Sequence, residues 1–512
     1  MRHLGSGDAA PARLDVRLVP AALTGWIVSA AGIVWPVGRA LALCGVAMGA
    51  AAAVLYCVTR AGSPPRRIAA GLAACGVVGA GFGVAVGLRA EAVDHHPITA
   101  AFGTTAPVTV TPTESAQSLG RGRLMFRASL LRLHGDEISG RVVVFARAAD
   151  FGEVMVGRPV GFSARIARPT RHDLTVAVLK AAGRPAVGRA GAVQEAAHAV
   201  RSRFAATVRE VLPADQAAAL PALVLGDTSA LTTDTSRDFR AAGLTHLTAV
   251  SGANVTIVCA AVLFCARLIG RRAAVLTTAA ALAAFVIVVQ PTASVLRAAV
   301  MGAIALLGML SSRRRQAVPA LSATVLILLT VAPQLAVDVG FALSVVATAA
   351  LVVIAPAWSR RLAARGCPKP LADALAVAAA AHMVTAPLVA GISGRFSLVA
   401  PIANLAVAAV IAPITVLGSA AAVLCVSWPA GAQLLIRFTG PELWWVLNVA
   451  KWTAAVPAAT APVPSGVPGV LVVGGITVLV IGCRRWRPLR VGVAATAMCV
   501  LAWSLSGLVG AA

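Results

Sequence analysis

The stretch LVLGDTSALTTDTSRDFRAAGLTHLTAVSGANVTI, residues 223–257, decides how the whole chain is interpreted. It stands where a polar, arginine-rich middle segment gives way to a long series of apolar runs. Polar groups in hydrocarbon are costly and usually face a cavity, a pore or each other. A glycine-punctuated polar run that leads into an apolar span is typical of broken or re-entrant helices. From the residues alone, the alternative is an interfacial loop ahead of a helix capped by Ser251.

The composition of the 512-residue chain is that of a membrane protein. Hydrophobic residues make up 59% of it and charged residues 12%, with a mean hydropathy of +0.85. Because no soluble domain keeps so apolar a composition over this length, we expect a polytopic α-helical integral membrane protein with about 11–13 spans or re-entrant helices. The formal charge of +25 has two explanations. One is an anionic partner, either nucleic acid or lipid headgroups. The other is the arginine that accumulates in the cytoplasmic loops of membrane proteins.

Four regions are predicted along the chain. Residues 1–90 contain three apolar runs of roughly 20 residues, the length that crosses a bilayer. Residues 91–190 alternate apolar and polar positions in about five short strands, which is typical of a small β-barrel of the OB type. Residues 191–222 have the spacing of amphipathic or interfacial helices. Residues 223–512 form the main transmembrane domain.

The positions of the arginines predict the orientation. Arg60, Arg66 and Arg67 lie between the second and third apolar runs, and the positive-inside rule places that loop and the N-terminus in the cytoplasm. The β-barrel is then extracytoplasmic, and the protein is a multi-pass protein of the cytoplasmic membrane. Counting spans forward would place the arginines at 484–490 outside. We therefore expect one run between Ser397 and Val456 to be re-entrant or interfacial.

Prolines interrupt the last third of the chain. Pro401, Pro413 and Asn404 predict an interrupted helix that lines a cavity. The later spans are expected at residues 415–426, 443–456, 467–482 and 491–508.

Short motifs in the transmembrane domain resemble those of the ComEC competence proteins, a family of inner-membrane channels for transforming DNA. The matching residues of the opening stretch are Leu225-Gly226-Asp227, Phe239, Gly243-Leu244, His246-Leu247 and Ala249-Val250-Ser251-Gly252. Three further family elements follow in order, with the residues Ser294, Arg297, Ala298 and Met301, then Gly340-Phe341 and Ser344, then Phe396-Ser397, Pro401 and Asn404. Asn254 departs from the family pattern, because many members carry a histidine there.

The resemblance implies a channel that carries single-stranded DNA across the cytoplasmic membrane during natural competence. A route for a polyanion needs a wet, polar lining that bears cations. The residues expected to line or gate it are Asp227, His246, Ser251, Asn254, Arg297, Asp338, Ser344 and Asn404. Two other classes stay open: a secondary transporter of a smaller anionic or lipid-linked solute, and a membrane scaffold.

Arginine is also abundant in the predicted β-barrel. A basic groove holds a phosphate backbone by counterion release, and the ComEC family carries an OB-like domain at this point. The candidate DNA-binding residues are Arg123, Arg127, Arg141, Arg147 and Arg165. Stacking on bases needs aromatic side chains, and we expect at least two of the four phenylalanines at 126, 145, 151 and 162 to lie in the core. The alternative is a folding or gating module.

Several sequence signatures of catalysis are missing from the chain. It has no HxHxDH run for a two-metal hydrolase, no GK[ST] phosphate loop and no GxSxG elbow. We therefore expect a non-enzymatic protein without cofactor, metal site or catalytic residue, and without the C-terminal metallo-β-lactamase-like nuclease domain that many ComEC members carry. The expected partners are single-stranded DNA, membrane lipid, a DNA receptor, a separate nuclease, and a cytoplasmic ATPase or DNA-binding protein.

Overall fold

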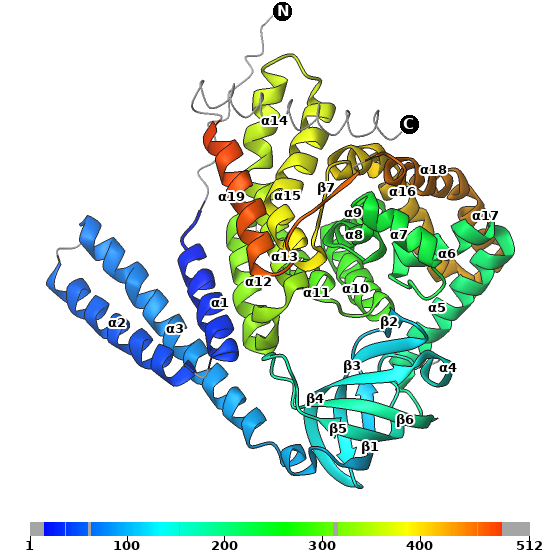
Figure 1. The fold of residues 1–512 in the computed structure, drawn as a ribbon. Helices are drawn as coiled ribbons and strands as arrows, with labels where there is room; N and C mark the ends of the chain where they lie inside the picture. The colour runs from blue at the N-terminus through cyan, green and yellow to red at the C-terminus, as the bar shows by residue number, and fades with distance from the viewer. Residues whose placement is uncertain are drawn as a thin grey trace, which may run out of the picture.

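A helical body and a β-barrel make up the part of the molecule described by the computed structural model, which covers residues 15–483 except positions 36, 60–62, 153, 311–315 and 458. The arginines at 484–490 and the expected span at 491–508 lie outside these residues. The barrel lies below the helices in Figure 1. It is inserted between α3 (Pro64–Asp94) and α5 (Ala192–Val211).

The first three helices are α1 (Val19–Val34), α2 (Gly38–Val58) and α3. α2 and α3 form a hairpin that projects from the rest of the molecule in Figure 1. Their backbones approach closely at glycines, because a Cβ added at Gly76 would collide with the backbone of Gly49. Small residues are the usual means by which membrane helices come this close.

The β-barrel has the strand order of an OB-fold. Its strands are β1 (Thr105–Pro112), β2 (Gln117–Gly120), β3 (Arg123–Leu133), β4 (Asp136–Arg147), β5 (Val160–Ala167) and β6 (Ala177–Val187). Five of them close in the order β1-β5-β6-β4-β3, with β3 pairing back to β1 and β2 added at the edge of β3. The β4–β6 pairing is parallel and the other pairings are antiparallel. This confirms the predicted OB-like barrel.

Apolar side chains, which alternate with polar ones along the strands, fill the interior of the barrel. Along β5, Val160, Phe162, Ala164 and Ile166 are buried while the residues between them are not, as expected when successive side chains point to opposite faces. The short helix α4 (Ala148–Phe151) adds Phe151 to this core. Phe126 is buried as well, so three of the four phenylalanines are core residues. Phe145 stays 38% exposed.

Within the described residues, eight helices are long and apolar enough to cross a membrane. They are α2, α3, α9 (Gly252–Ala266, extended by a 3-10 turn to Ile269), α10 (Arg271–Val289), α11 (Ala293–Leu310), α13 (Val339–Val353) with α14 (Ala355–Ala363), α15 (Lys369–Ser393) and α16 (Ala400–Ser427). Shorter apolar helices are α1, α6 (Ala214–Leu225), α12 (Ala317–Val331) and α19 (Val467–Cys483). The protein is therefore a polytopic helical membrane protein with a small barrel domain.

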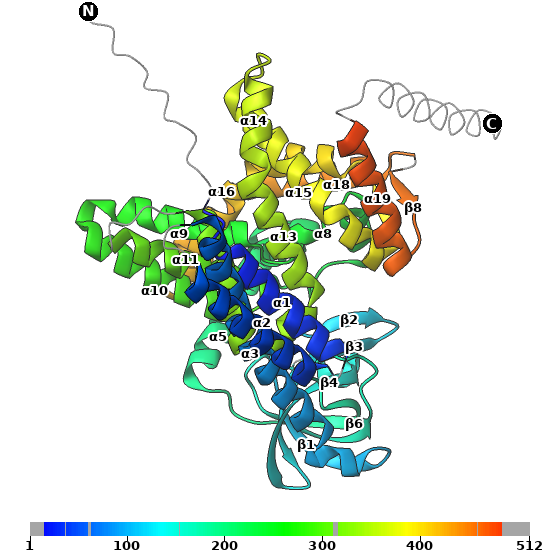
Figure 2. The same cartoon turned by 90° about the vertical axis from the view of Figure 1, so that its left-hand side faces the viewer.

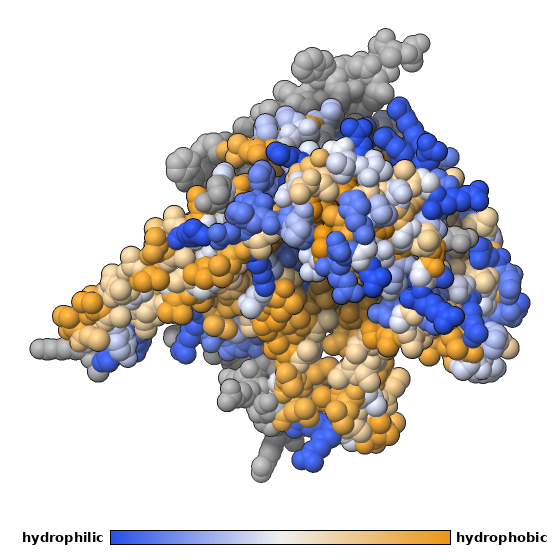
Figure 3. All heavy atoms as spheres, turned by 90° about the horizontal axis from the view of Figure 1, so that it is seen from below, coloured by the Kyte–Doolittle hydropathy of each residue, from blue (hydrophilic) through white to orange (hydrophobic). Residues whose placement is uncertain are grey.

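Apolar and hydrophilic surfaces separate in the space-filling view from below. In Figure 3 the projecting α2–α3 hairpin on the left is mostly apolar, whereas hydrophilic side chains gather around the barrel. An apolar outer surface is what lipid contact requires. The distribution agrees with helices that lie in a bilayer and a barrel that lies outside it.

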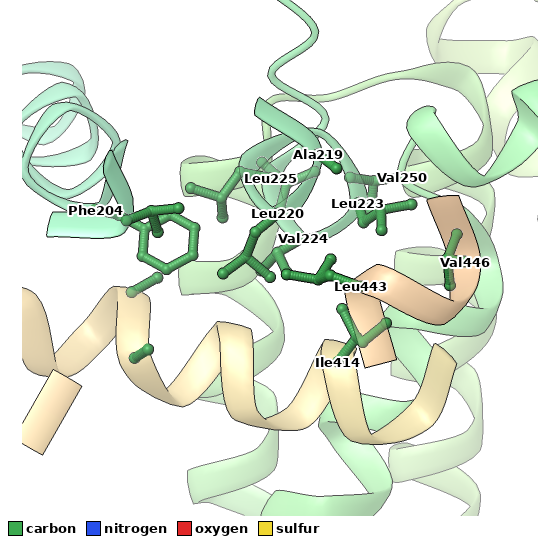
Figure 4. Packing of buried hydrophobic residues seen from close by; sticks show 14 of the residues in the cluster. Phe204, Ala219, Leu220, Leu223, Val224, Leu225, Val250, Ile414, Leu443 and Val446 are labelled. Carbon is green, nitrogen blue, oxygen red and sulfur yellow. The ribbon is translucent and has the colours of Figure 1, made fainter. Parts of the chain in front are cut away.

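Helix α6 is buried within the helical body. All residues from Ala217 to Leu225 are buried, and Figure 4 shows Leu220 and Val224 among Phe204 of α5, Ile414 of α16 and Leu443 of α18 (Gly440–Ala454). A helix that is apolar on every side needs such a buried position. The prediction of interfacial helices for residues 191–222 is thus wrong for α6, whereas α5 has the expected amphipathic form and buries Ala197, Phe204 and Val208.

The region of the expected interrupted helix is continuous. α16 runs unbroken from Ala400 to Ser427, so that prediction is wrong. Pro401 lies in the first turn, where its missing N–H costs nothing, and Pro413 is the kind of proline that membrane helices tolerate. α17 (Pro429–Phe438) and α18 follow. At 15 residues, α18 is shorter than a span requires, which supports the expectation that one run before Val456 does not cross.

Short elements complete the described fold. A two-stranded antiparallel sheet joins β7 (Arg395–Ser397) to β8 (Thr460–Pro462). Two more helices, α7 (Thr233–Ala241) and α8 (Thr245–Thr248), lie between α6 and α9, and two further 3-10 turns cover Pro97–Ala101 and Pro333–Val337.

Candidate functional site

The stretch between α6 and α9 contains several helix ends, which glycines and a side-chain cap fix in place. α6 stops at Gly226, whose φ of 71° is left-handed, and α7 stops before Gly243, with a φ of 72°. Such angles favour glycine. Gly243 is needed for a second reason, because a Cβ there would collide with Ala400 at the start of α16. The Thr232 side chain accepts a hydrogen bond from the Thr235 N–H at 3.1 Å and caps α7. Local capping thus folds this polar segment against the helical body.

Asp227 lies opposite an arginine of α5. Its carboxylate is 3.7 Å from Arg201 Nη2 and accepts hydrogen bonds from the N–H and hydroxyl of Ser229 at 3.2 Å and 2.6 Å. Arg201 also donates to the carbonyl oxygens of Leu225 and Val288, at the ends of α6 and α10. Helix-end carbonyls carry partial negative charge. Asp227 therefore belongs to a structural joint between three helices.

Arg201 was not among the predicted site residues. It follows Ala197 by four positions and precedes Phe204 by three, so it occupies the buried face of α5. An arginine in the middle of an apolar helix face is the sequence signal that identifies it.

Ser251 and Asn254 form one polar pair at the start of α9. Ser251 Oγ lies 3.3 Å from Asn254 Oδ1 and donates to it. The Asn254 amide donates to the carbonyl oxygen of Leu223 in α6 at 3.0 Å, and Asn254 is only 5% exposed. A buried amide needs such partners. The pair thus ties the beginning of α9 to the end of α6.

Arg297 of α11 is buried beside that pair, with 6% of its surface exposed. Its Nε donates to Ser344 Oγ of α13 at 2.6 Å, and its Nη1 contacts Met301 Sδ at 3.3 Å. Ser344 Oγ is also 3.1 Å from Ser294 Oγ. No carboxylate forms an ion pair with Arg297 among the residues the structure describes. A Cβ added at Gly252 would collide with Arg297 Nη2, so the guanidinium lies against the first residue of α9.

Four of the eight predicted lining residues therefore come together. We call Ser251, Asn254, Arg297 and Ser344, together with Gly252, the α9–α11 polar cluster. Its members come from α9, α11 and α13 and are joined by the contacts described above. A charged group buried among apolar helices is expected to face a cavity or a ligand.

His246 and Asn404 stand apart from this cluster. The Asn404 amide donates to the Ala400 carbonyl oxygen of its own helix at 2.8 Å. His246 in α8 is exposed. Protein around its ring disfavours the charged form and so lowers the pKa of His246, while a hydrogen bond with the Gly243 backbone partly opposes that effect.

Asp338 lies at the junction between barrel and helices. Its Oδ1 accepts a hydrogen bond from the Phe341 N–H at 2.8 Å and caps α13. Its other oxygen is 4.0 Å from Arg127 Nη1 of β3. Arg127 also forms an ion pair with Glu114 at 3.0 Å. Burial lowers the pKa of Arg127, but Glu114 and Asp338 outweigh that effect and raise it overall.

Arg127 and its neighbour Arg141 are therefore directed at the junction. Arg141 is half-buried, and its Nη1 is enclosed without a hydrogen-bond partner in the described part of the chain. Burial, and then the charge of Arg127, lower the pKa of Arg141. A hydrogen bond also crosses the junction, because Ser115 of the barrel donates to Gln290 in the turn between α10 and α11. Arg127 thus links the barrel to the helices, and Arg141 lies beside it at the same junction.

The other three candidate arginines are exposed on one outer face of the barrel. Arg123 pairs with Arg147 across β3 and β4, and Arg165 pairs with Lys180 across β5 and β6. Phe145, the exposed phenylalanine, is opposite Lys180. Directly paired residues project on the same side of a sheet. We call Arg123, Arg147, Arg165, Lys180 and Phe145 the basic face.

An open hollow adjoins the basic face. It measures about 530 Å³ and is lined by Phe102, Arg168 and the two basic residues Arg165 and Lys180, among others. The guanidinium of Arg168 lies over the ring of Phe102 at 5.6 Å. A surface of this kind offers cations to phosphates and a ring edge to bases.

Fold and site together define a polytopic membrane protein that carries an OB-type barrel and encloses a buried, cationic polar cluster. A family model described as "Competence protein" matches residues 223–488, which is more than half of the chain and includes the whole α9–α11 polar cluster. The chain belongs to the competence protein family. Comparison with curated proteins and with solved structures gave no match.

Proposed function

We propose that this chain forms the route by which single-stranded DNA crosses the cytoplasmic membrane during competence. Membership of the competence protein family supports a role in DNA uptake. The observation that carries the finer proposal is Arg297, a buried cation without a carboxylate partner among the described residues, set between membrane helices. A polyanion passing through hydrocarbon needs such a lining. The α9–α11 polar cluster would line part of the route, and His246 and Asn404 are proposed to line other parts of it.

The barrel is proposed to collect the strand before it enters the helices. Its basic face carries four cations around one exposed phenylalanine, which is the combination that holds single strands through phosphate contacts and stacking. Arg123, Arg147 and Arg165 retain their predicted DNA-binding role in this proposal. Arg127 and Asp338 are left out, because they form an ion pair at the junction. Arg141 is left out because it lies beside Arg127 with its Nη1 enclosed.

The orientation in this proposal follows from arginine. Four basic residues stand at the end of α14, in the turn after it and at the start of α15: Arg360, Arg361, Arg365 and Lys369. This turn lies at the end of the molecule opposite the barrel in Figure 2. By the positive-inside rule that turn is cytoplasmic. The barrel is then outside, where incoming DNA arrives, and the N-terminus is inside. A DNA receptor, a separate nuclease and a cytoplasmic ATPase or DNA-binding protein complete the proposed system.

A secondary transporter of a smaller anionic or lipid-linked solute is the second candidate. One observation favours it: the α9–α11 polar cluster holds a single unpaired arginine, enough for one anionic group. This candidate gives the basic face of the barrel no part in transport.

The test is entry of fluorescent DNA into a nuclease-resistant pool inside cells of a transformable host. Deleting the chain should abolish that pool. The double change Arg147→Gln and Arg165→Gln should lower uptake and flatten its salt dependence, because each lost phosphate contact removes about 0.7 from the slope of log affinity against log salt. Arg132→Gln is the matched control, since Arg132 is exposed on the same barrel but already paired with Glu137. Full uptake after deletion would refute the channel.

A further inference from the structure

Two positively charged groups face each other inside the helical body. One is the guanidinium of Arg297, which reaches the position that a Cβ of Gly252 would occupy. The other is the N-terminus of α9, which begins at Gly252. Because Cα–Cβ bonds tilt toward the N-terminus of a helix, Arg297 Nη2 lies at the N-terminal end of α9.

The start of α9 has no negative group of its own. Its first turn contains no acidic residue, and the Ser251 side chain does not cap it. The N–H groups of Asn254 and Val255 reach the Ser251 carbonyl oxygen. No hydrogen bond is present for the N–H groups of Gly252 and Ala253 among the described residues. Such free N–H groups carry the positive end of the helix dipole.

Within the described residues, no negative group balances these two positive groups. Charges of like sign repel strongly where the dielectric constant is low. Arg297 is nine-tenths buried, and its side-chain contacts within the described residues are with Ser344 and Met301. An anion between the guanidinium and the helix N-terminus would convert the repulsion into two attractions. Helix N-termini and arginine forks are both common phosphate-binding groups.

We infer that Arg297 and the N-terminus of α9 form a binding site for one phosphodiester monoanion. Arg297 supplies the charge, and the N–H groups of Gly252 and Ala253 supply hydrogen bonds. Gly252 has to be glycine, because a side chain would occupy the place of the guanidinium. Ala253 is exposed and Gly252 is half-buried, so other parts of the protein leave the first turn of α9 uncovered for a ligand.

The identity of the ligand rests on the proposed function. A phosphate group of a DNA strand in transit has this chemistry, and so has the headgroup of a phospholipid. We assign the site to DNA, because the basic face of the barrel offers the same chain further cations for phosphates outside the helices. The experiment separates the two sources.

The test uses the full chain in maltoside micelles, which contain no phosphate. Dimethyl phosphate is the probe and neutral trimethyl phosphate is its control. The Tm of the protein should rise with the concentration of dimethyl phosphate alone, since a ligand that binds only the folded state stabilises it. Arg297→Gln should raise the apparent Kd about tenfold or more, as loss of a charge-assisted bond predicts. Gly252→Ala should have a similar effect, and Arg360→Gln, at the far end of the helices, should have none.

Three results would overturn the inference. The Tm could respond equally to both phosphate esters, the response could survive Arg297→Gln, or Arg297→Lys, which keeps the charge without the fork, could bind as tightly as wild type. Should Arg297→Gln fail to fold, Gly252→Ala and Arg297→Lys still decide the matter.

A second arm distinguishes the ligand sources. Short-chain phosphatidylglycerol and a phosphodiester oligonucleotide are each added, with an uncharged methylphosphonate oligonucleotide as control. An effect of the lipid without a difference between the two oligonucleotides would overturn the assignment to DNA. Cellular uptake separates the two proposals. If Arg297→Gln leaves DNA uptake intact, this site has no role in transit, but the channel proposal still stands. If the protein binds phosphate but its deletion leaves uptake unchanged, the channel proposal alone is refuted.

Discussion

At the scale of single residues, Arg201 shows how one side chain joins the start of the transmembrane domain. It contacts Asp227 and the terminal carbonyl oxygens of α6 and α10. These partners come from segments far apart in the sequence, so helical spacing identifies the buried position of Arg201 but does not identify what it contacts. The sequence placed Asp227 among the residues expected to line the route but gave no sign of its pairing with Arg201.

Replacing Arg201 should destabilise the protein strongly. Arg201→Ala leaves the Asp227 carboxylate and two helix ends without their partner, which should lower the free energy of unfolding by about 2–4 kcal/mol. Arg203→Ala on the same helix is the matched control, because Arg203 is exposed. Thermal unfolding in micelles measures both. Equal Tm values for the two variants would contradict the role assigned to Arg201.

At the scale of elements, regular patterns were predictable and exceptions were not. The five barrel strands follow from alternation, because alternation reports directly which side of a strand is buried. β2 escaped prediction, since all four of its residues are exposed and no alternation marks it. The unbroken α16 also escaped, because the sequence shows Pro413 but not the packing that keeps the helix continuous around it.

The α2–α3 hairpin should depend on glycine at its contact. Gly76→Ala places a methyl group into the backbone of Gly49 and should cost about 1–3 kcal/mol through forced separation of the helices. Gly71→Ala and Gly81→Ala are matched controls on the same helix, because a Cβ at either position meets nothing within 4 Å. Thermal unfolding of the three variants checks the prediction. A loss of stability in the controls as large as in Gly76→Ala would show that the contact is not the cause.

At the scale of the whole molecule, the barrel is held on the helices at several points. The chain enters it from α3 and leaves it into α5, and Arg127 and Ser115 connect it to Asp338 and Gln290. The OB topology was predictable from five strands, whereas this docking was not. One of the five arginines assigned to DNA, Arg127, contacts the helices, and the arginine content of the sequence does not reveal which side of the barrel faces them.

Two substitutions at Asp338 distinguish its role as the cap of α13 from its role in the ion pair with Arg127. Asp338→Asn keeps a good helix cap and removes only a long ion pair, so stability should change by less than about 1 kcal/mol. Asp338→Ala removes the cap too and should cost about 1 kcal/mol more. Thermal unfolding measures both, and DNA uptake by Asp338→Asn should remain at the wild-type level. Loss of uptake in a stable Asp338→Asn variant would return Asp338 to the lining of the route.

In the proposed function, the attachment of the barrel at both ends would also govern avidity. A strand held on the basic face would stay tethered close to the helices, so its encounter with the α9–α11 polar cluster would become an intramolecular event. Over short tethers the effective concentration is of millimolar order, far above that of free DNA around a cell. Two individually weak contacts can then retain one strand firmly, and each can release it quickly enough to let the next nucleotide advance.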